Sequence, residues 1–143
     1  MTDVEWLRLD AIARIGASSE DIEHPLEHAL VTGQGTEWRA SQSGTQLIQV
    51  RFHEPRHVRR IRLVIADPDQ SRTQEFTLTW SSNRGERHRV VVRQQFNFSR
   101  LGATTEVEDY RVDLVDATSL ELRIVPDISG GDAVARLTEL LVA

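Results

Sequence analysis

The sequence contains no cysteine and no lysine among its 143 residues. The lack of cysteine excludes disulfide bonds, thiolate zinc sites and cysteine nucleophiles together. All 17 basic residues are therefore arginine, spread along the chain, which is typical of the codon usage of a GC-rich genome. The alternative interpretation is chemical, because arginine pairs bidentately with carboxylates and phosphates. A formal net charge of -5 disfavours a nucleic-acid partner bound through its phosphate backbone.

Long apolar runs and a secretory leader are also missing. No run approaches the ~20 apolar residues of a membrane-spanning helix. The acidic N-terminus lacks the basic region with which a signal peptide begins. We therefore expect a cytoplasmic protein with no membrane partner.

Signatures of catalysis are equally scarce. Gly33-Gln34-Gly35 lacks the third glycine of a dinucleotide-binding fingerprint. Ser18 and Ser19 have no recognisable histidine and carboxylate with which to form a triad. We expect a protein that is not an enzyme and that carries no cofactor.

What is present is a series of short apolar and polar alternations separated by turn residues, the pattern of half-buried β-strands. Eight segments fit: Trp6–Ala17, Leu47–Phe52, Val58–Ile65, Phe76–Trp80, Val90–Val92, Val107–Leu114, Leu120–Ile124 and Ala135–Val142. The first also has the alanine content of a helix, and we favour a strand because Gly16–Ser19 then ends it as a loop. One short helix is expected at His24–Leu30, with Pro25 at its first position. This pattern predicts an all-β, antiparallel jelly-roll β-sandwich formed by one domain, residues 1–143.

Several local features refine this prediction. Glu54-Pro55 is expected to end one strand, Ser81–Gly85 to form a hairpin turn, and Glu108-Asp109 to form a β-bulge. Trp38 and Trp80 are expected in the core. Phe96 and Phe98 are two residues apart and would share one face of a strand. They indicate core residues or, if that segment is exposed, a contact patch.

The order of several short motifs resembles the discoidin, or coagulation-factor type C, domains of the galactose-binding-like fold. The motifs are Ser18-Ser19, His24–Leu30, Trp38-Arg39-Ala40, Gly44–Val50 and the closing Leu137–Leu140. The resemblance covers nearly the whole chain and implies a non-catalytic module that binds carbohydrate or another small polar ligand. Part of the same pattern is similar to the N-terminal domain of the scaffold of DNA single-strand-break repair. That similarity implies an intracellular domain that binds a protein partner or nucleic acid.

The resemblance also bears on metal binding. Members often carry an aspartate-containing loop before the tryptophan, which can hold calcium. Here the loop Val31–Glu37 contains no aspartate, so calcium is not expected. If a metal binds, the resemblance points to Thr36 and Glu139 as its ligands.

In such sandwiches the ligand lies on the loops at one end. The resemblance implies that Ser41–Gly44, Asp67–Gln74 and Asp127–Asp132 form this end. The proposed ligand-binding residues are polar members of the last two segments: Asp69, Arg72, Gln74, Asp127 and Asp132. An arginine offers paired donors to vicinal hydroxyls. The alternative is that Arg72 bridges Asp69 or Glu75 and fixes the turn, and none of these loops carries an aromatic platform for a sugar.

Overall fold

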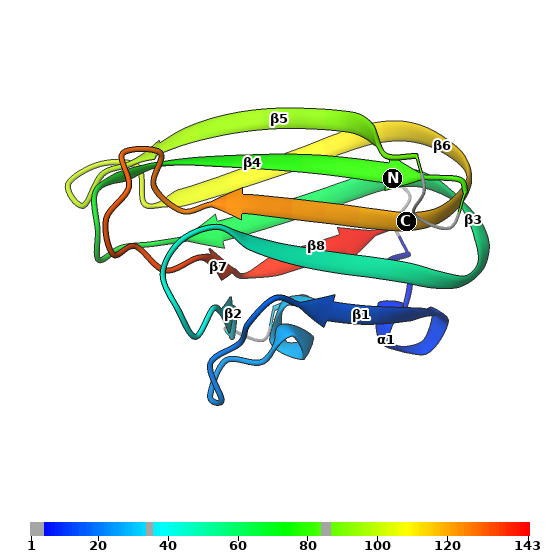
Figure 1. Ribbon diagram of the computed structural model, residues 1–143, viewed down its shortest axis with the longest axis horizontal. Coiled ribbons are helices and arrows are strands. Elements are labelled where there is room, and N and C mark those ends of the chain that lie inside the picture. Colours follow the sequence, from blue (N-terminus) through cyan, green and yellow to red (C-terminus); the bar gives the residue numbers. More distant parts are fainter. Residues whose placement is uncertain (1–4, 34–35, 84–86) are drawn as a thin grey trace.

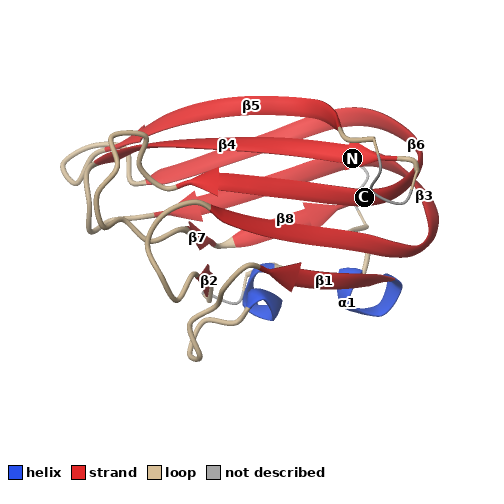
Figure 2. Cartoon of the chain, viewed as in Figure 1, coloured by secondary structure: helices blue, strands red, loops and turns tan. Residues whose placement is uncertain are grey.

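The computed structural model describes residues 5–33, 36–83 and 87–143, and within them the chain is mostly β-strand (Figure 1). The elements are α1 (Leu9–Ile12), β1 (Ala13–Ala17), the 3-10 helix η1 (Leu26–Ala29), β2 (Trp38–Arg39), β3 (Gln46–Ala66), β4 (Arg72–Ser81), β5 (Arg89–Phe98), β6 (Thr105–Val125), β7 (Arg136–Leu137) and β8 (Glu139–Val142). The helical turns lie beside β1 and β2, away from β4 and β5 (Figure 2). No helix among these residues is long and apolar enough to cross a membrane.

Two long strands organise the sandwich. β3 and β6 are 21 residues each and pair antiparallel along their length. Residues 46–52 of β3 and 119–125 of β6 belong to one sheet with the order β1-β3-β6-β4-β5, which we call the five-stranded half. Residues 58–66 of β3 lie between residues 105–114 of β6 and β8, pair with both, and form the three-stranded half with them. Figure 1 shows both long strands bending at the same end of the molecule, so that the two halves face each other. The prediction of an all-β sandwich is confirmed.

The bend replaces a turn that the sequence predicts. Glu54-Pro55 was expected to end a strand, but β3 continues through it, and the pairing with β6 shifts register between Arg51 and Arg60. Proline lacks an amide hydrogen and is tolerated in strands at such irregularities. On β6, Asp116 has a φ of 56°, in the left-handed region, opposite this segment. The bulge expected at Glu108-Asp109 is wrong, because pairing there is regular.

The N-terminal region also differs from expectation. Only Ala13–Ala17 of the segment Trp6–Ala17 is a strand, and α1 precedes it as a single helical turn. The apolar alternation was misleading here, because the turn places Leu9 in the core at 1% exposure. The expected helix at His24–Leu30 is present as the shorter η1, and Pro25 is its N-cap. The last expected strand, Ala135–Val142, is divided into β7 and β8.

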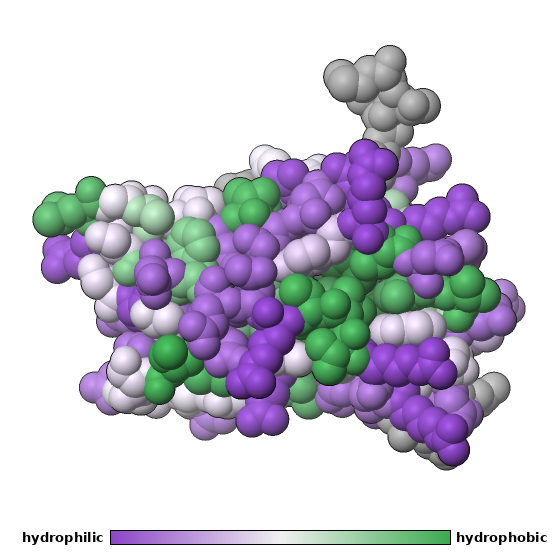
Figure 3. All heavy atoms as spheres, turned by 90° about the horizontal axis from the view of Figure 1, so that it is seen from above, coloured by the Kyte–Doolittle hydropathy of each residue, from purple (hydrophilic) through white to green (hydrophobic). Residues whose placement is uncertain are grey.

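The core lies between the two halves and contains the inward-facing positions of both. Trp38 is fully buried, as predicted, and its indole Nε1 donates to the Ser19 carbonyl at 3.0 Å. Trp80 is only half-buried, and the Arg89 guanidinium lies 5.7 Å from its ring centroid. Phe98 is buried while Phe96 is half-buried against the core. Seen from above, over β5 and β6, apolar side chains gather in the middle of a largely polar surface (Figure 3).

Candidate binding site at the loop end

The loops that were predicted to form one end of the sandwich do lie together. Residues 40–45, 67–71, 99–104 and 126–135 gather at the end opposite the bend of β3 and β6 (Figure 1). Backbone hydrogen bonds connect them: the Gly44 amide donates to the Ala133 carbonyl at 3.3 Å, and the Ile128 amide to the Thr73 carbonyl at 2.9 Å. We call this region the loop end.

A salt bridge inside the loop end fixes the segment between β3 and β4. The Arg72 side chain is 1% exposed, and its Nε donates to Asp67 Oδ2 at 2.8 Å. Its Nη1 donates to the Pro126 carbonyl at 2.5 Å, which connects β4 to the loop after β6. The guanidinium also lies over the Phe98 ring, 4.6 Å from the centroid. These contacts position two loops with one side chain.

Two of the residues predicted to bind a ligand are enclosed by these contacts. Arg72 and Gln74 are buried, at 5% and 0% exposure. Arg72 Nε and Nη1 and the Gln74 side chain bond to the protein, whereas Arg72 Nη2 has no partner among the described residues. Whether either residue contacts a ligand stays a prediction. The alternative, that Arg72 fixes the turn, describes the structure, but the partner is Asp67 rather than Asp69 or Glu75. Sequence reasoning places an arginine outside because arginines are rarely fully buried without a partner, and Asp67 is that partner.

Arg136, which the sequence did not single out, extends this arrangement. It forms an ion pair with Glu37 at 2.7 Å and contacts Asp67 Oδ1 at 3.2 Å and Asp69 Oδ2 at 3.3 Å. Glu37 also accepts from Arg39 at 3.2 Å. Arg136 therefore joins β7 to the residue that precedes β2 and to the loop after β3. A signal was available, because Arg136 lies between apolar residues, with Ala135 before it and Leu137 after it.

A buried carboxylate, Glu106, which is 1% exposed, belongs to the same arrangement. Its Oε1 accepts from Gln74 Nε2 at 3.0 Å, while Oε2 has no partner among the described residues. Burial and the nearby Glu108 raise the pKa of Glu106 to about 7. Tyr110 donates to Glu108 at 2.9 Å, and burial raises the pKa of this phenol. We call the connected set the loop-end polar network: Glu37, Asp67, Arg72, Gln74, Glu106 and Arg136.

Asp67 is the centre of the network. Burial raises the pKa of its carboxyl, but Arg72, the Asp69 amide and Arg136 outweigh burial and hold the pKa below its ordinary value. Its Oδ1 also accepts the amides of Asp69 and Gln70 at 3.0 and 3.3 Å. Hydrogen bonds to a charged carboxylate stabilise that form, so Asp67 holds the loop as an anion.

The remaining predicted residues stay accessible. Asp69 has a side chain that is 71% exposed, and Asp132 is exposed as well. Asp127 is half-buried, and its Oδ1 accepts the Ser129 amide at 3.0 Å. Asp127 lines a hollow of about 270 Å³ between the loops 44–45 and 125–133, together with the half-exposed Ile128. Whether these aspartates bind a ligand stays a prediction.

Glycines shape the rim of this hollow. Gly44, Gly130 and Gly131 have φ values of 88°, 87° and 91°, which residues with a Cβ rarely adopt. A Cβ built on any of the three meets no atom within 4 Å, so conformation and not crowding requires glycine. The loops are therefore held in shape while leaving open space for a ligand.

The two residues named above as metal ligands interact with other parts of the protein. Thr36 Oγ1 donates to the His28 carbonyl at 3.5 Å, and Glu139 forms an ion pair with Arg62 at 3.5 Å. Throughout the described ranges, no three His, Asp or Glu side chains are grouped to hold a metal ion.

The comparisons with known proteins found similar solved structures. No family model matches the sequence, and no curated protein sequence matches it. A family 32 carbohydrate-binding module (CBM) of Clostridium perfringens NanJ, solved with galactose, superimposes with a TM-score of 0.71 at 15% identity, covering 96% of each chain.

This chain has the galactose-binding-like sandwich fold. Two further modules superimpose similarly. The CBM32 of AlyQ, solved with 4,5-unsaturated mannuronic acid, gives a TM-score of 0.67 at 20% identity and covers 92% of this chain and 95% of that one. A chitosan-binding module of a Paenibacillus sp. IK-5 chitosanase/glucanase gives 0.66 at 18% identity, with coverage of 92% and 94%. The similarity to the repair scaffold stays a prediction.

Proposed function

We propose that this protein is a non-catalytic carbohydrate-binding module whose ligand lies at the loop end. The observation that carries the proposal is the structural similarity to modules solved with sugars, which extends over almost the whole chain. Individual modules of similar shape bind galactose, an unsaturated uronate or chitosan, so the fold accommodates several ligands. The ligand of this chain follows from its own loops.

The chemistry of the loop end supports a sugar ligand. Asp127 and Asp132 offer carboxylates, which accept hydrogen bonds from vicinal hydroxyls. Ile128 offers an aliphatic surface for the C–H face of a pyranose in place of an aromatic ring, and it is 47% exposed. Asp69, on the loop after β3, is held by its ion pair with Arg136. The loop-end polar network keeps the loops in place, and such pre-organisation lowers the entropy lost on binding.

Isothermal titration calorimetry with galactose, chitosan oligosaccharides and oligogalacturonate tests the proposal. The double variant Asp127→Ala/Asp132→Ala should bind the recognised sugar at least about tenfold more weakly, because hydrogen bonds to charged groups contribute roughly 1.5–3 kcal/mol. The matched control is Asp10→Ala/Asp113→Ala, which removes the same charge from exposed aspartates outside the loop end. Equal loss in both variants, or no binding of any sugar, would overturn the loop-end proposal.

A further inference from the structure

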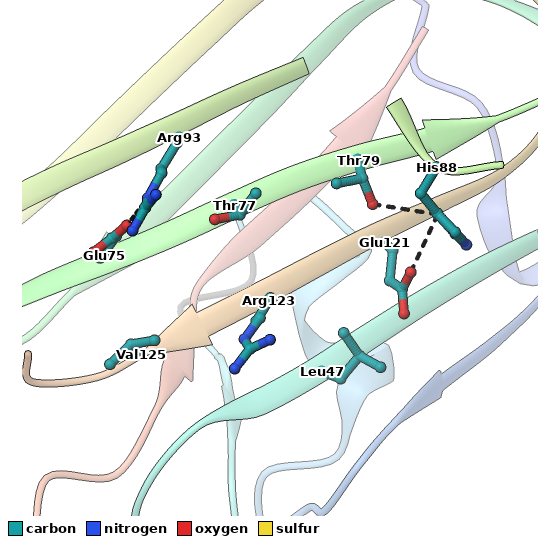
Figure 4. Close-up of a pocket in the computed structure, with 9 residues that line it drawn as sticks. All are labelled: Leu47, Glu75, Thr77, Thr79, His88, Arg93, Glu121, Arg123 and Val125. Carbon is teal, nitrogen blue, oxygen red and sulfur yellow. Dashed lines mark hydrogen bonds and ion pairs between the residues drawn. The ribbon is translucent and has the colours of Figure 1, made fainter. Parts of the chain in front are cut away.

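A hollow larger than the one at the loop end lies on the outer face of the five-stranded half. Its volume is about 710 Å³, and outward-facing side chains of β3, β6, β4 and β5 line it (Figure 4). One row of paired residues crosses it: Leu47, Arg123, Thr77 and Arg93. Nothing in the proposed function uses this face.

The charged side chains that line this hollow form two pairs, and one arginine belongs to neither pair. Figure 4 shows Glu75 beside Arg93, with which it forms an ion pair, and Glu121 beside His88, with an ion-pair distance of 3.2 Å. Glu121 also accepts from Gln49 at 3.2 Å. Arg123 projects between these two groups and has no hydrogen bond or ion pair to any residue that the structure describes.

A second hollow of about 230 Å³ continues the same face toward β1. Gln49 lines it and connects it to the first hollow through Glu121. Arg14 and Arg51 also line it and are directly opposite each other on β1 and β3. Like charges in this arrangement are destabilising, and neither arginine has an acidic partner within the described ranges. A bound anion would relieve this repulsion.

The face therefore carries an excess of positive charge on an acidic protein. Among the described residues that line the two hollows there are four arginines and two glutamates, against a net charge of -5 for the whole chain. Arg123 and Arg93 flank Thr77, and two strand spacings separate them by about 10 Å. Thr77 and Thr79 add hydroxyls between the charges. The ligand that fits carries several negative charges and many hydroxyls along an extended chain.

We infer that the outer face of the five-stranded half binds an acidic polysaccharide, a chain of uronic acids. Arg123 and the opposed pair Arg14 and Arg51 receive carboxylates, because guanidinium groups pair bidentately with them. Thr77 and Thr79 receive ring hydroxyls. The inference rests on the proposed function, since it gives the same module a second carbohydrate surface with a defined substrate class. Among the described residues, no Phe, Tyr or Trp side chain lines these hollows, so stacking of nucleic-acid bases is disfavoured.

The test is a titration of ¹⁵N-labelled protein with oligogalacturonate, its neutral methyl ester and a single-stranded oligonucleotide, at low salt. Oligogalacturonate should shift the amide signals of Leu47, Thr77 and Arg123. The variant Arg51→Gln/Arg123→Gln should weaken its binding by about tenfold or more, because it removes two guanidinium groups that would pair with carboxylates. The control Arg111→Gln, an exposed arginine of the three-stranded half, should change it less than about twofold.

The outcomes separate the inference from the proposed function. Binding of oligogalacturonate only at Gly130, Gly131 and their neighbours would overturn the sheet-face site and keep the loop end. Equal binding of the methyl ester or of the oligonucleotide would overturn the requirement for a uronate. Binding of neutral sugars alone would also overturn the requirement for a uronate. Absence of binding to any glycan would overturn both the sheet-face site and the proposed function.

Discussion

The loop end and the outer face of the five-stranded half use the same residue types in opposite ways. At the loop end, Arg72 and Arg136 are enclosed by carboxylates and carbonyls and hold loops together. On the outer face, Arg14, Arg51 and Arg123 stand without acidic partners among the described residues. An arginine's role here therefore depends on whether acidic groups of the protein already neutralise its charge. Balanced arginines support a site, and unbalanced ones are available to a ligand.

The largest effect should come from removing the enclosed arginine. Arg72→Met keeps much of the side-chain volume but leaves Asp67 as a buried, partly unpaired charge and the Pro126 carbonyl without its donor. Breaking a buried pair in this way costs about 3–5 kcal/mol, so urea unfolding should show a loss of that size. Arg123→Met, the matched change on the outer face, should alter the free energy of unfolding by less than about 0.5 kcal/mol. Similar losses in both variants would remove the distinction between the two regions.

The next effect concerns pH. The pKa of Glu106 is raised in the folded protein from 4.5 to about 7, so folding favours its protonated form. The protonated Glu106 therefore stabilises the folded protein fully below pH 4.5. As the pH rises from 4.5 through 7 this contribution is lost, and the free energy of unfolding falls by roughly 3 kcal/mol. Glu106→Gln should flatten this dependence, and the variant should be more stable than the parent at pH 8. A parent and variant with parallel stability curves between pH 4.5 and 8 would show that Glu106 titrates normally.

The smallest effect should appear on the outer face. Arg51→Gln removes the repulsion with Arg14, and unfavourable cross-strand pairs contribute roughly 0.2–1 kcal/mol. The variant should therefore melt at a slightly higher temperature than the control Arg111→Gln at low salt. The difference should vanish near 1 M salt, where the screening length is about 3 Å. A variant that melts below the control would indicate that Arg14 and Arg51 do not repel each other.

The fold was more predictable than the sites. Alternation placed Ile48, Val50 and Leu122 inside and gave most of the strands, because that signal is local. The continuity of β3 through Glu54-Pro55 was not predictable, since it depends on pairing with β6, far away in the sequence. The two-residue β2 had no alternation from which to be recognised.

The sites depend still more on distant partners. Nothing near Arg72 in the sequence shows that the Pro126 carbonyl will lie against it, so its burial was missed. Asp69, Asp127 and Asp132 were placed at the loop end correctly, because loops between strands are exposed. The pair Arg14 and Arg51 becomes visible only once the register of β1 with β3 is known.

The continuous passage of β3 and β6 through both halves has a consequence for hydrogen exchange. The amides of residues 46–52 and 58–66 belong to one strand and face one partner, β6, on either side of the bend. Neither half can therefore open fully while the other keeps its central ladder intact. The central amides of both halves should exchange through one common opening, with the free energy of global unfolding, while those of α1 and η1 exchange earlier.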